Sequence, residues 1–196
     1  VRAKSKGNFL FIPVLLLFAV SEAIFQLGIL RLVNVNPVLG INLALHTVII
    51  LIVLIGARVI PFFISRSTGT DIPALPKYIE RLTYLTLILW TVSSLVVGNQ
   101  HIWTALFAGF AAIFQAYRLK AWHVKKLWSV PMLWILYLGY CWIFIGLFLQ
   151  ALNLLEPLMP SIPVHALTTG AIGMITLGMM SRVSLGHTGR DIGHTR

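Results

Sequence analysis

The sequence predicts an all-α integral membrane protein with about six transmembrane helices and both termini in the cytoplasm. The first observation is composition: 58% of the 196 residues are hydrophobic, only 10% are charged, and the mean hydropathy is +0.90. A soluble domain is usually about 45–50% apolar and about 25% charged. The other two observations are a series of long apolar runs and a one-sided distribution of basic residues between them. Together they indicate a single transmembrane domain over residues 1–196.

The apolar runs define the elements in chain order. The first is too long to be the core of a signal peptide, and the second is expected to break at Pro61. The third and fourth are short for a bilayer, so we expect them to extend into Tyr78–Arg81 and Arg118–Trp122. The runs are continuous and do not alternate, which favours helices over a β-barrel. We place the six at Phe9–Leu30, Leu39–Ile64, Leu82–Val97, Ile102–Tyr117, Pro131–Leu152 and Pro163–Met180.

The basic residues predict the orientation of these helices. Fourteen of the 15 Lys and Arg residues lie in the amino-terminal tail, the second loop with its flanks, the fourth loop and the carboxy-terminal tail. The first, third and fifth loops hold only Arg31. Because positively charged loops stay in the cytoplasm, six crossings with both termini inside fit this pattern. The net charge of +10 then faces lipid headgroups, and we expect no nucleic-acid binding.

This topology gives each polar residue a depth. Glu22, His46 and His165 fall in an outer group, and Arg58, Arg182 and His187 fall in an inner group. Ionisable residues in lipid are costly and usually mark function. His46 and His165 come from different helices at the same predicted level, and such an imidazole pair could hold a b-type haem. His165 and His187 are 22 residues apart, about 33 Å along a helix, so they cannot share one metal within a subunit.

The segment "HALTTGAIGMITLGMMSRVSLGHTGR", His165 to Arg190, combines several of these features. The pair Ala166/Gly170 lets a neighbouring helix or a flat macrocycle approach closely, although ordinary helix packing explains it equally. Arg182 and Arg190 could bind a haem propionate or a lipid phosphate. Arg58 could contact a propionate or extend to the headgroups. Glu22 is either a relay carboxylate or a neutral hydrogen-bonded acid.

Several classes of chemistry are disfavoured. The lone cysteine, Cys141, forms no CxxC or CxxCH motif, which argues against covalent haem and against an iron–sulfur cluster held by this chain alone. No P-loop, paired-carboxylate site or Ser–His–Asp set is present in the sequence, which argues against nucleotide chemistry and hydrolysis.

The His165–Arg190 segment resembles the signature of the NnrS family. "GARVIPFF" (residues 56–63) and "WSVPMLWILYLGYCW" (residues 128–142) are also similar to segments of that family. The resemblance implies a bacterial inner-membrane protein that carries haem and copper and acts in nitric oxide response, nitrosative stress resistance or denitrification. Tyr137 stands where many members have His. Family members are about twice this length, and this sequence does not begin with Met. We therefore expect the chain to be the carboxy-terminal half of a longer protein.

The leading hypothesis is therefore an NnrS-like haem and copper protein. His46, His165 and His187 are its expected metal ligands, and Arg58, Arg182 and Arg190 its expected charge partners. Its expected partners are membrane lipids, the amino-terminal half and a possible second copy. Two alternatives remain open: a transporter for an anion or metal complex, and a b-type cytochrome in quinol electron transfer. The sequence does not decide whether the protein is an enzyme.

Overall fold

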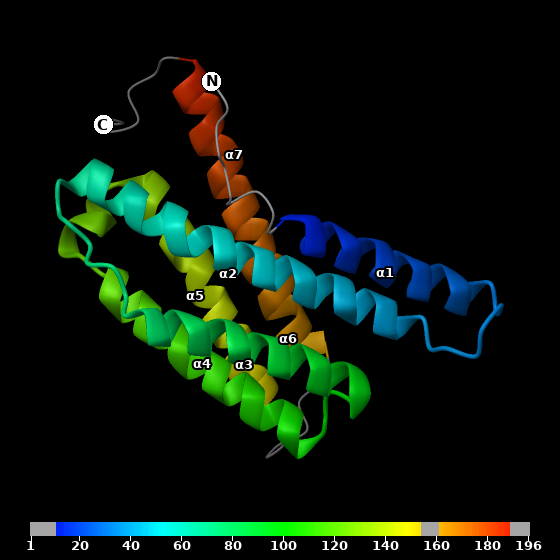
Figure 1. Ribbon diagram of the computed structural model, residues 1–196. Helices are drawn as coiled ribbons and strands as arrows, with labels where there is room; N and C mark the ends of the chain where they lie inside the picture. The colour runs from blue at the N-terminus through cyan, green and yellow to red at the C-terminus, as the bar shows by residue number, and fades with distance from the viewer. Residues whose placement is uncertain (1–10, 154–160, 189–196) are drawn as a thin grey trace, which may run out of the picture. The chain divides into compact units, whose positions relative to one another are not determined.

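The computed structural model describes residues 11–153 and 161–188, and within these ranges the regular structure is helical, with no strand. Among the described residues, six helices are long and apolar enough to cross a membrane, which confirms the predicted all-α membrane fold class. The last of them is a continuous span, Ser161–Leu185, that includes α6, η3 and most of α7. In chain order the elements are α1 (Phe11–Ile29), α2 (Val38–Thr68), α3 (Lys77–Val96), α4 (Ile102–Trp122), η2 (Lys125–Ser129), α5 (Pro131–Leu152), α6 (Ser161–His165), η3 (Ala166–Gly173) and α7 (Met174–His187) (Figure 1).

The chain divides into two compact units, Val1–Leu51 and Ile52–Arg196. In the described part of the first unit, α1 packs against the beginning of α2. Gly40 makes this approach possible, because a Cβ there would lie 2.5 Å from the Ser21 carbonyl oxygen and 2.8 Å from the Phe25 nitrogen. Any larger residue would force the two backbones apart.

The second unit is built around α5. Helix α3 packs against α4, α4 packs against α5, and α5 packs against α6, η3 and α7 (Figure 1). Two glycines of α5 allow the last contact. A Cβ at Gly139 would lie 2.7 Å from the Ile175 side chain, and a Cβ at Gly146 would lie 2.5 Å from that of Leu167. Small residues let helix backbones approach closely, which is the usual way that membrane helices gain dispersion contacts.

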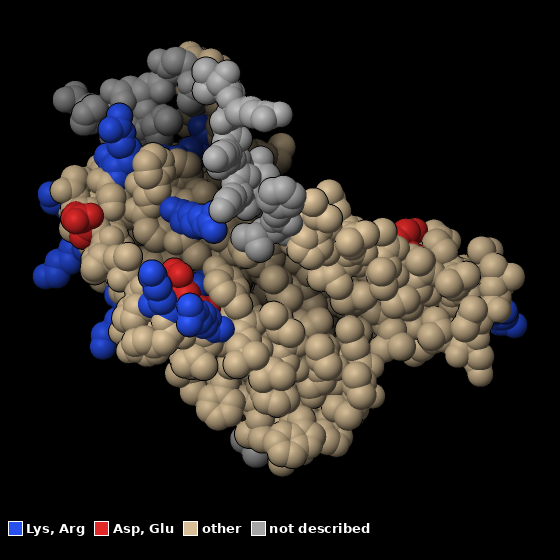
Figure 2. Space-filling model, viewed as in Figure 1, with Lys and Arg blue, Asp and Glu red and all other residues tan. Residues whose placement is uncertain are grey.

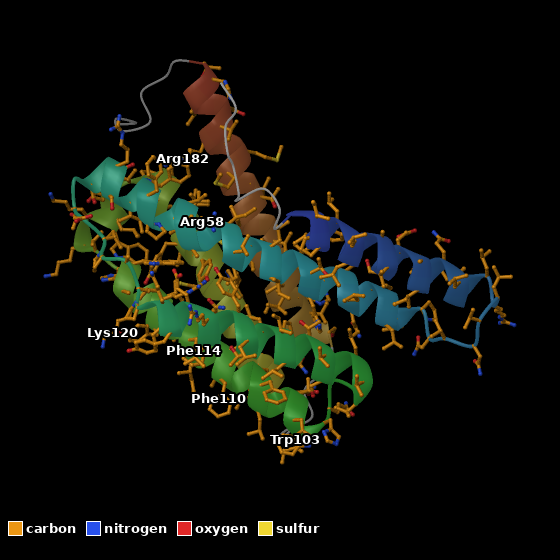
Figure 3. The ribbon with its side chains drawn as sticks, in the orientation of Figure 1. Arg58, Trp103, Phe110, Phe114, Lys120 and Arg182 are labelled. Carbon is orange, nitrogen blue, oxygen red and sulfur yellow. The ribbon has the colours of Figure 1, made fainter. Side chains whose placement is uncertain are left out.

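The outer faces of the second unit are apolar, as a lipid-facing surface should be. Trp103 and Phe110 project from α4 about two turns apart, and Lys120 lies at the other end of that helix (Figure 3). Trp103 is 56% exposed and Phe110 is 52% exposed. A soluble protein rarely leaves such large side chains open along a whole helix, so this face fits contact with acyl chains.

Lys and Arg side chains of the second unit gather at one end of the face shown in Figure 2, with acidic side chains beside them. That end is where α2 ends, α3 begins and α4 ends (Figure 1). The grouping agrees with the prediction that the second and fourth loops share one side of the membrane. Which side is cytoplasmic stays a prediction.

Helix boundaries confirm the expected extensions of the short spans, since α3 begins at Lys77 and α4 ends at Trp122. One expectation about an individual residue is wrong. Helix α2 continues through Pro61 to Thr68 and does not break there. In a bundle, neighbouring groups compensate for the hydrogen bond that a proline lacks. Arg118 lies inside α4, within the expected extension, and its full burial is a finding that the charge pattern does not predict.

Candidate functional site

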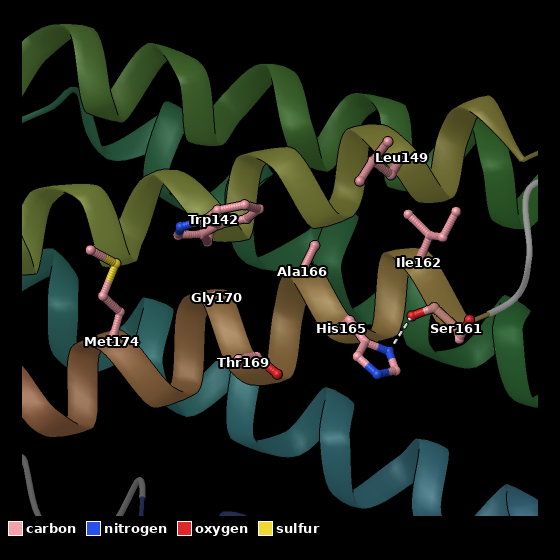
Figure 4. Close-up of a pocket in the computed structure, with 9 residues that line it drawn as sticks. All are labelled: Trp142, Leu149, Ser161, Ile162, His165, Ala166, Thr169, Gly170 and Met174. Atoms are coloured by element: carbon pink, nitrogen blue, oxygen red, sulfur yellow. Dashed lines mark hydrogen bonds between the residues drawn. The ribbon is translucent and has the colours of Figure 1, made fainter.

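The first candidate site is a groove between α5 and the last transmembrane span. It has a volume of about 620 Å³, and α5 contributes Trp142 and Leu149 to its lining. The other side carries His165, Thr169 and other residues of α6, η3 and the start of α7. Figure 4 shows His165 and Thr169 projecting from the same side of this span. The lining is apolar apart from a few polar groups, which is typical of a site for a flat hydrophobic ligand.

The imidazole of His165 has a defined tautomer. Its Nδ1 lies 2.7 Å from the Ser161 carbonyl oxygen, one turn earlier in α6 (Figure 4). A carbonyl oxygen only accepts hydrogen bonds, so Nδ1 carries the proton and donates it. In neutral imidazole the lone pair is then on Nε2, and the side chain is exposed. This is the arrangement of a ligating histidine whose second nitrogen is fixed by a backbone carbonyl.

The span is unusual at this point, because η3 is a π-helix over Ala166–Gly173. Its backbone bonds reach five residues back, and π-helical turns within α-helices are often found at functional sites. The wide turns follow His165 directly and place Gly170 against Trp142. A Cβ at Gly170 would lie 2.6 Å from the indole ring. Nothing in the hydrophobic pattern of this segment distinguishes a π-helix from an α-helix, so the sequence analysis missed it.

Met174 also lines the groove. Methionine thioethers bind haem iron in some proteins. It lies nine residues after His165 on the same span, about 13 Å further along the helix axis. Two side chains of one helix at that separation cannot approach a metal from opposite faces. Met174 therefore contributes apolar surface here, and any second ligand must come from another element.

The groove lining does not include the other predicted ligands. His46 is buried in α2 within the first unit, so its pairing with His165, in the second unit, stays a prediction. His187 is exposed at the end of α7. Across residues 11–153 and 161–188, no group of three or more His, Cys, Asp or Glu side chains comes together in a way that could hold a metal ion. Copper binding therefore stays a prediction.

The two predicted arginines that the structure describes have different environments. Arg182 is buried, and its guanidinium carbon lies 3.7 Å from the centroid of the Phe63 ring. Arg58 is exposed on α2 (Figure 3). Arg190 lies outside the described residues. Arg182 follows His165 by 17 residues, about 25 Å along the helix axis, so it would serve a group bound at the opposite end of that span.

Glu22 and Tyr137 each have a local partner. Glu22 is exposed, and Oε1 of its carboxyl group accepts a hydrogen bond of 2.7 Å from Gln26 Nε2. The Tyr137 hydroxyl donates to the Leu119 carbonyl oxygen at 3.0 Å, and its ring lies 6.2 Å from that of His123. Tyr137 therefore joins α5 to the end of α4, and the groove lining does not include it.

Comparison with known proteins gives one match. A family model described as NnrS protein matches residues 1–196. No curated protein and no solved structure matches the chain.

Proposed function

The chain belongs to the NnrS family, and from this premise we propose that it is a multi-pass bacterial inner-membrane protein that binds a b-type haem in the α5–η3 groove and acts in the response to nitric oxide. Family membership supports the biological role. The observation that carries the haem site is the His165 Nδ1–Ser161 hydrogen bond, which leaves Nε2 as a ligand beside an apolar groove of about 620 Å³.

The residues of the groove have separable roles in this proposal. His165 would hold the haem iron through Nε2, and the Ser161 carbonyl would fix the orientation of the imidazole and raise its basicity. Trp142 would pack against the macrocycle, and the missing side chain at Gly170 keeps the indole close to the helix. Haem iron, when bound, would supply the chemistry that binds diatomic ligands such as nitric oxide.

Copper has weaker support here. The family resemblance implies it, but the described residues hold no three-ligand group. His187, near the end of the described chain, is the remaining exposed histidine among the predicted ligands, and one imidazole does not make a copper site. We therefore propose haem as the group held by this part of the chain and derive no step through copper.

Visible absorption of the purified full-length protein tests the proposal. We expect a Soret band, and we expect His165→Ala to lose most of the haem because it removes the axial nitrogen. His123→Ala is the matched control, because His123 is exposed and bonded to Trp128 outside the groove. Colourless wild-type protein, or full haem content in His165→Ala, would refute the proposed site.

A parallel measurement tests the predicted partner. If His46 and His165 bind the same iron, His46→Ala should change a low-spin spectrum to a high-spin one while part of the haem remains bound. An unchanged spectrum in His46→Ala would remove His46 from the site and leave His165 with a different partner.

A further inference from the structure

A second group of polar side chains lies inside the α3–α4–α5 core, away from the groove residues. The Tyr140 hydroxyl donates to Gln115 Oε1 at 2.6 Å. Arg118 Nη1 donates to the same hydroxyl at 3.2 Å and to the Val53 carbonyl oxygen at 3.4 Å. The side chains of Gln115, Arg118 and Tyr140 are all fully buried. We call these three residues the core polar cluster.

The hydrogen-bond and ring partners that the structure gives Arg118 are neutral. Its guanidinium carbon lies 5.2 Å from the centroid of the Tyr84 ring, and its hydrogen-bonding partners are the phenols of Tyr140 and Tyr84 and the Val53 carbonyl. Within the part of the chain that the structure describes, three nitrogen atoms of the cluster have no hydrogen-bond partner: Arg118 Nε, Arg118 Nη2 and Gln115 Nε2. All three are donors.

In the described part of the chain, these three nitrogen atoms therefore lack hydrogen-bond acceptors, and two of them belong to a positively charged guanidinium. A guanidinium stays protonated in proteins, and a buried charge without an opposite charge is costly. A water molecule could accept hydrogen bonds but would leave the charge uncompensated. A small anion would accept hydrogen bonds from several of these donors and would also compensate the charge of the guanidinium. We propose that the core polar cluster binds a small monovalent anion against Arg118 and Gln115.

Packing around the cluster limits the size of this anion. A Cβ at Gly56 would lie 3.1 Å from the Tyr140 ring, and the Trp122 ring centroid lies 4.9 Å from that of Tyr140. Both contacts leave little room beside the Tyr140 ring, so we expect a halide or a nitrite and not a large organic anion such as gluconate. Small anions of this kind can be exchanged for a large one in solution while the ionic strength is held constant.

One acidic residue offers a rival explanation. Glu80 lies one turn before Tyr84 on α3, and it lines a cavity of about 190 Å³ that Trp122 also lines. If its carboxylate supplies the opposite charge at a distance, no anion is needed. The two explanations differ in what happens to wild-type protein when the anion is changed, and in what Glu80→Gln does.

The test is the thermal unfolding midpoint of the full-length protein in detergent, measured in sodium chloride, sodium nitrite or sodium gluconate at one total ionic strength. We expect the midpoint to rise saturably with chloride or nitrite relative to gluconate, because an anion bound only to the folded state stabilises it. Arg118→Gln should abolish the rise. Gln115→Leu, which removes one donor, should weaken the apparent affinity about fivefold to tenfold.

Lys120→Gln is the matched control, since Lys120 is exposed on the same helix and its loss should leave the rise unchanged. Should Arg118→Gln fail to fold, the wild-type titration and Gln115→Leu still decide the matter. Equal wild-type midpoints in all three salts, or a rise that persists in Arg118→Gln, would overturn the proposal. An anion response that is present only in Glu80→Gln would assign the compensating charge to Glu80 and would also overturn it.

Discussion

The groove beside η3 and the core polar cluster both use helix α5, but their polar side chains differ in exposure and in hydrogen bonding. In the groove, the His165 imidazole is exposed and has one backbone partner, so one ring nitrogen is open to a ligand. In the cluster, Tyr140, Gln115 and Arg118 are sealed by packing and bonded to one another. The contrast separates an exposed site for a large apolar group from a buried polar network on which the fold depends and which would admit only a small anion. Substitutions should therefore affect ligand content and stability differently in the two regions.

The largest effect that we expect is at Gly170, where the groove meets the close packing of the bundle. In Gly170→Leu the new side chain would overlap the Trp142 ring, because even a Cβ would lie 2.6 Å from it. Overpacking of this kind costs about 1–3 kcal/mol and occasionally more, and because leucine adds three carbon atoms beyond the Cβ, we expect a cost at or above the top of that range. The thermal midpoint should fall and haem content should fall with it.

Gly173→Ala is the matched control for that substitution. The nearest atom to a Cβ at Gly173 is the Thr168 carbonyl oxygen at 3.7 Å, which is ordinary contact. A helical alanine is favoured over glycine by about 1 kcal/mol, so stability should stay the same or rise. A larger loss of stability in Gly173→Ala than in Gly170→Leu would contradict the packing that we describe.

A smaller effect is expected in the core polar cluster. Tyr140→Phe keeps the ring that packs on Trp122 but removes the hydroxyl that joins Gln115 to Arg118. A buried polar group that loses its partner costs about 1–3 kcal/mol, so the free energy of unfolding should fall by that amount while haem content stays at the wild-type level. Tyr117→Phe, at an exposed tyrosine of α4, should be close to neutral by the same thermal assay. Loss of haem in Tyr140→Phe would show that the two regions are coupled.

The smallest effect on stability should come from His165→Ala, although it should have the largest effect on haem content. The side chain is exposed, and exposed substitutions usually change stability by less than about 0.5 kcal/mol. The comparison should be made on haem-free protein, because bound haem itself stabilises the folded state. A marked drop in the haem-free midpoint would mean that His165 is a packing residue.

The sequence predicts the membrane spans well because each one is a local property of composition. The fifth span, Pro131–Leu152, has the predicted limits, and the third and fourth extend as bilayer thickness requires. The burial of Arg118 is not predicted, because an arginine at the edge of an apolar run satisfies the charge rule whether it is exposed or buried. Its burial depends on Tyr140, 22 residues later, and on Val53 in another helix. Contacts between distant segments leave no signal in one sequence.

The candidate site was predicted in part. The groove contains His165 and Gly170, both of which the sequence analysis singled out, and the family match agrees with the resemblance found in the motif. Trp142 and Met174 were not expected in it. Their positions depend on how α5 lies against the last span, which follows from the fit of Gly139 and Gly146 against Ile175 and Leu167 and cannot be read from periodicity.

The π-helix also sets the direction that α7 faces. Each residue of an α-helix turns the chain by about 100°, so adding or deleting one residue within residues 166–173 would rotate everything after it by about that angle. Such a change would aim Arg182 away from Phe63 while leaving His165 on its original side. The number of residues between 166 and 173 therefore matters more to this packing than their identity. One-residue deletions there should lower stability far more than substitutions do.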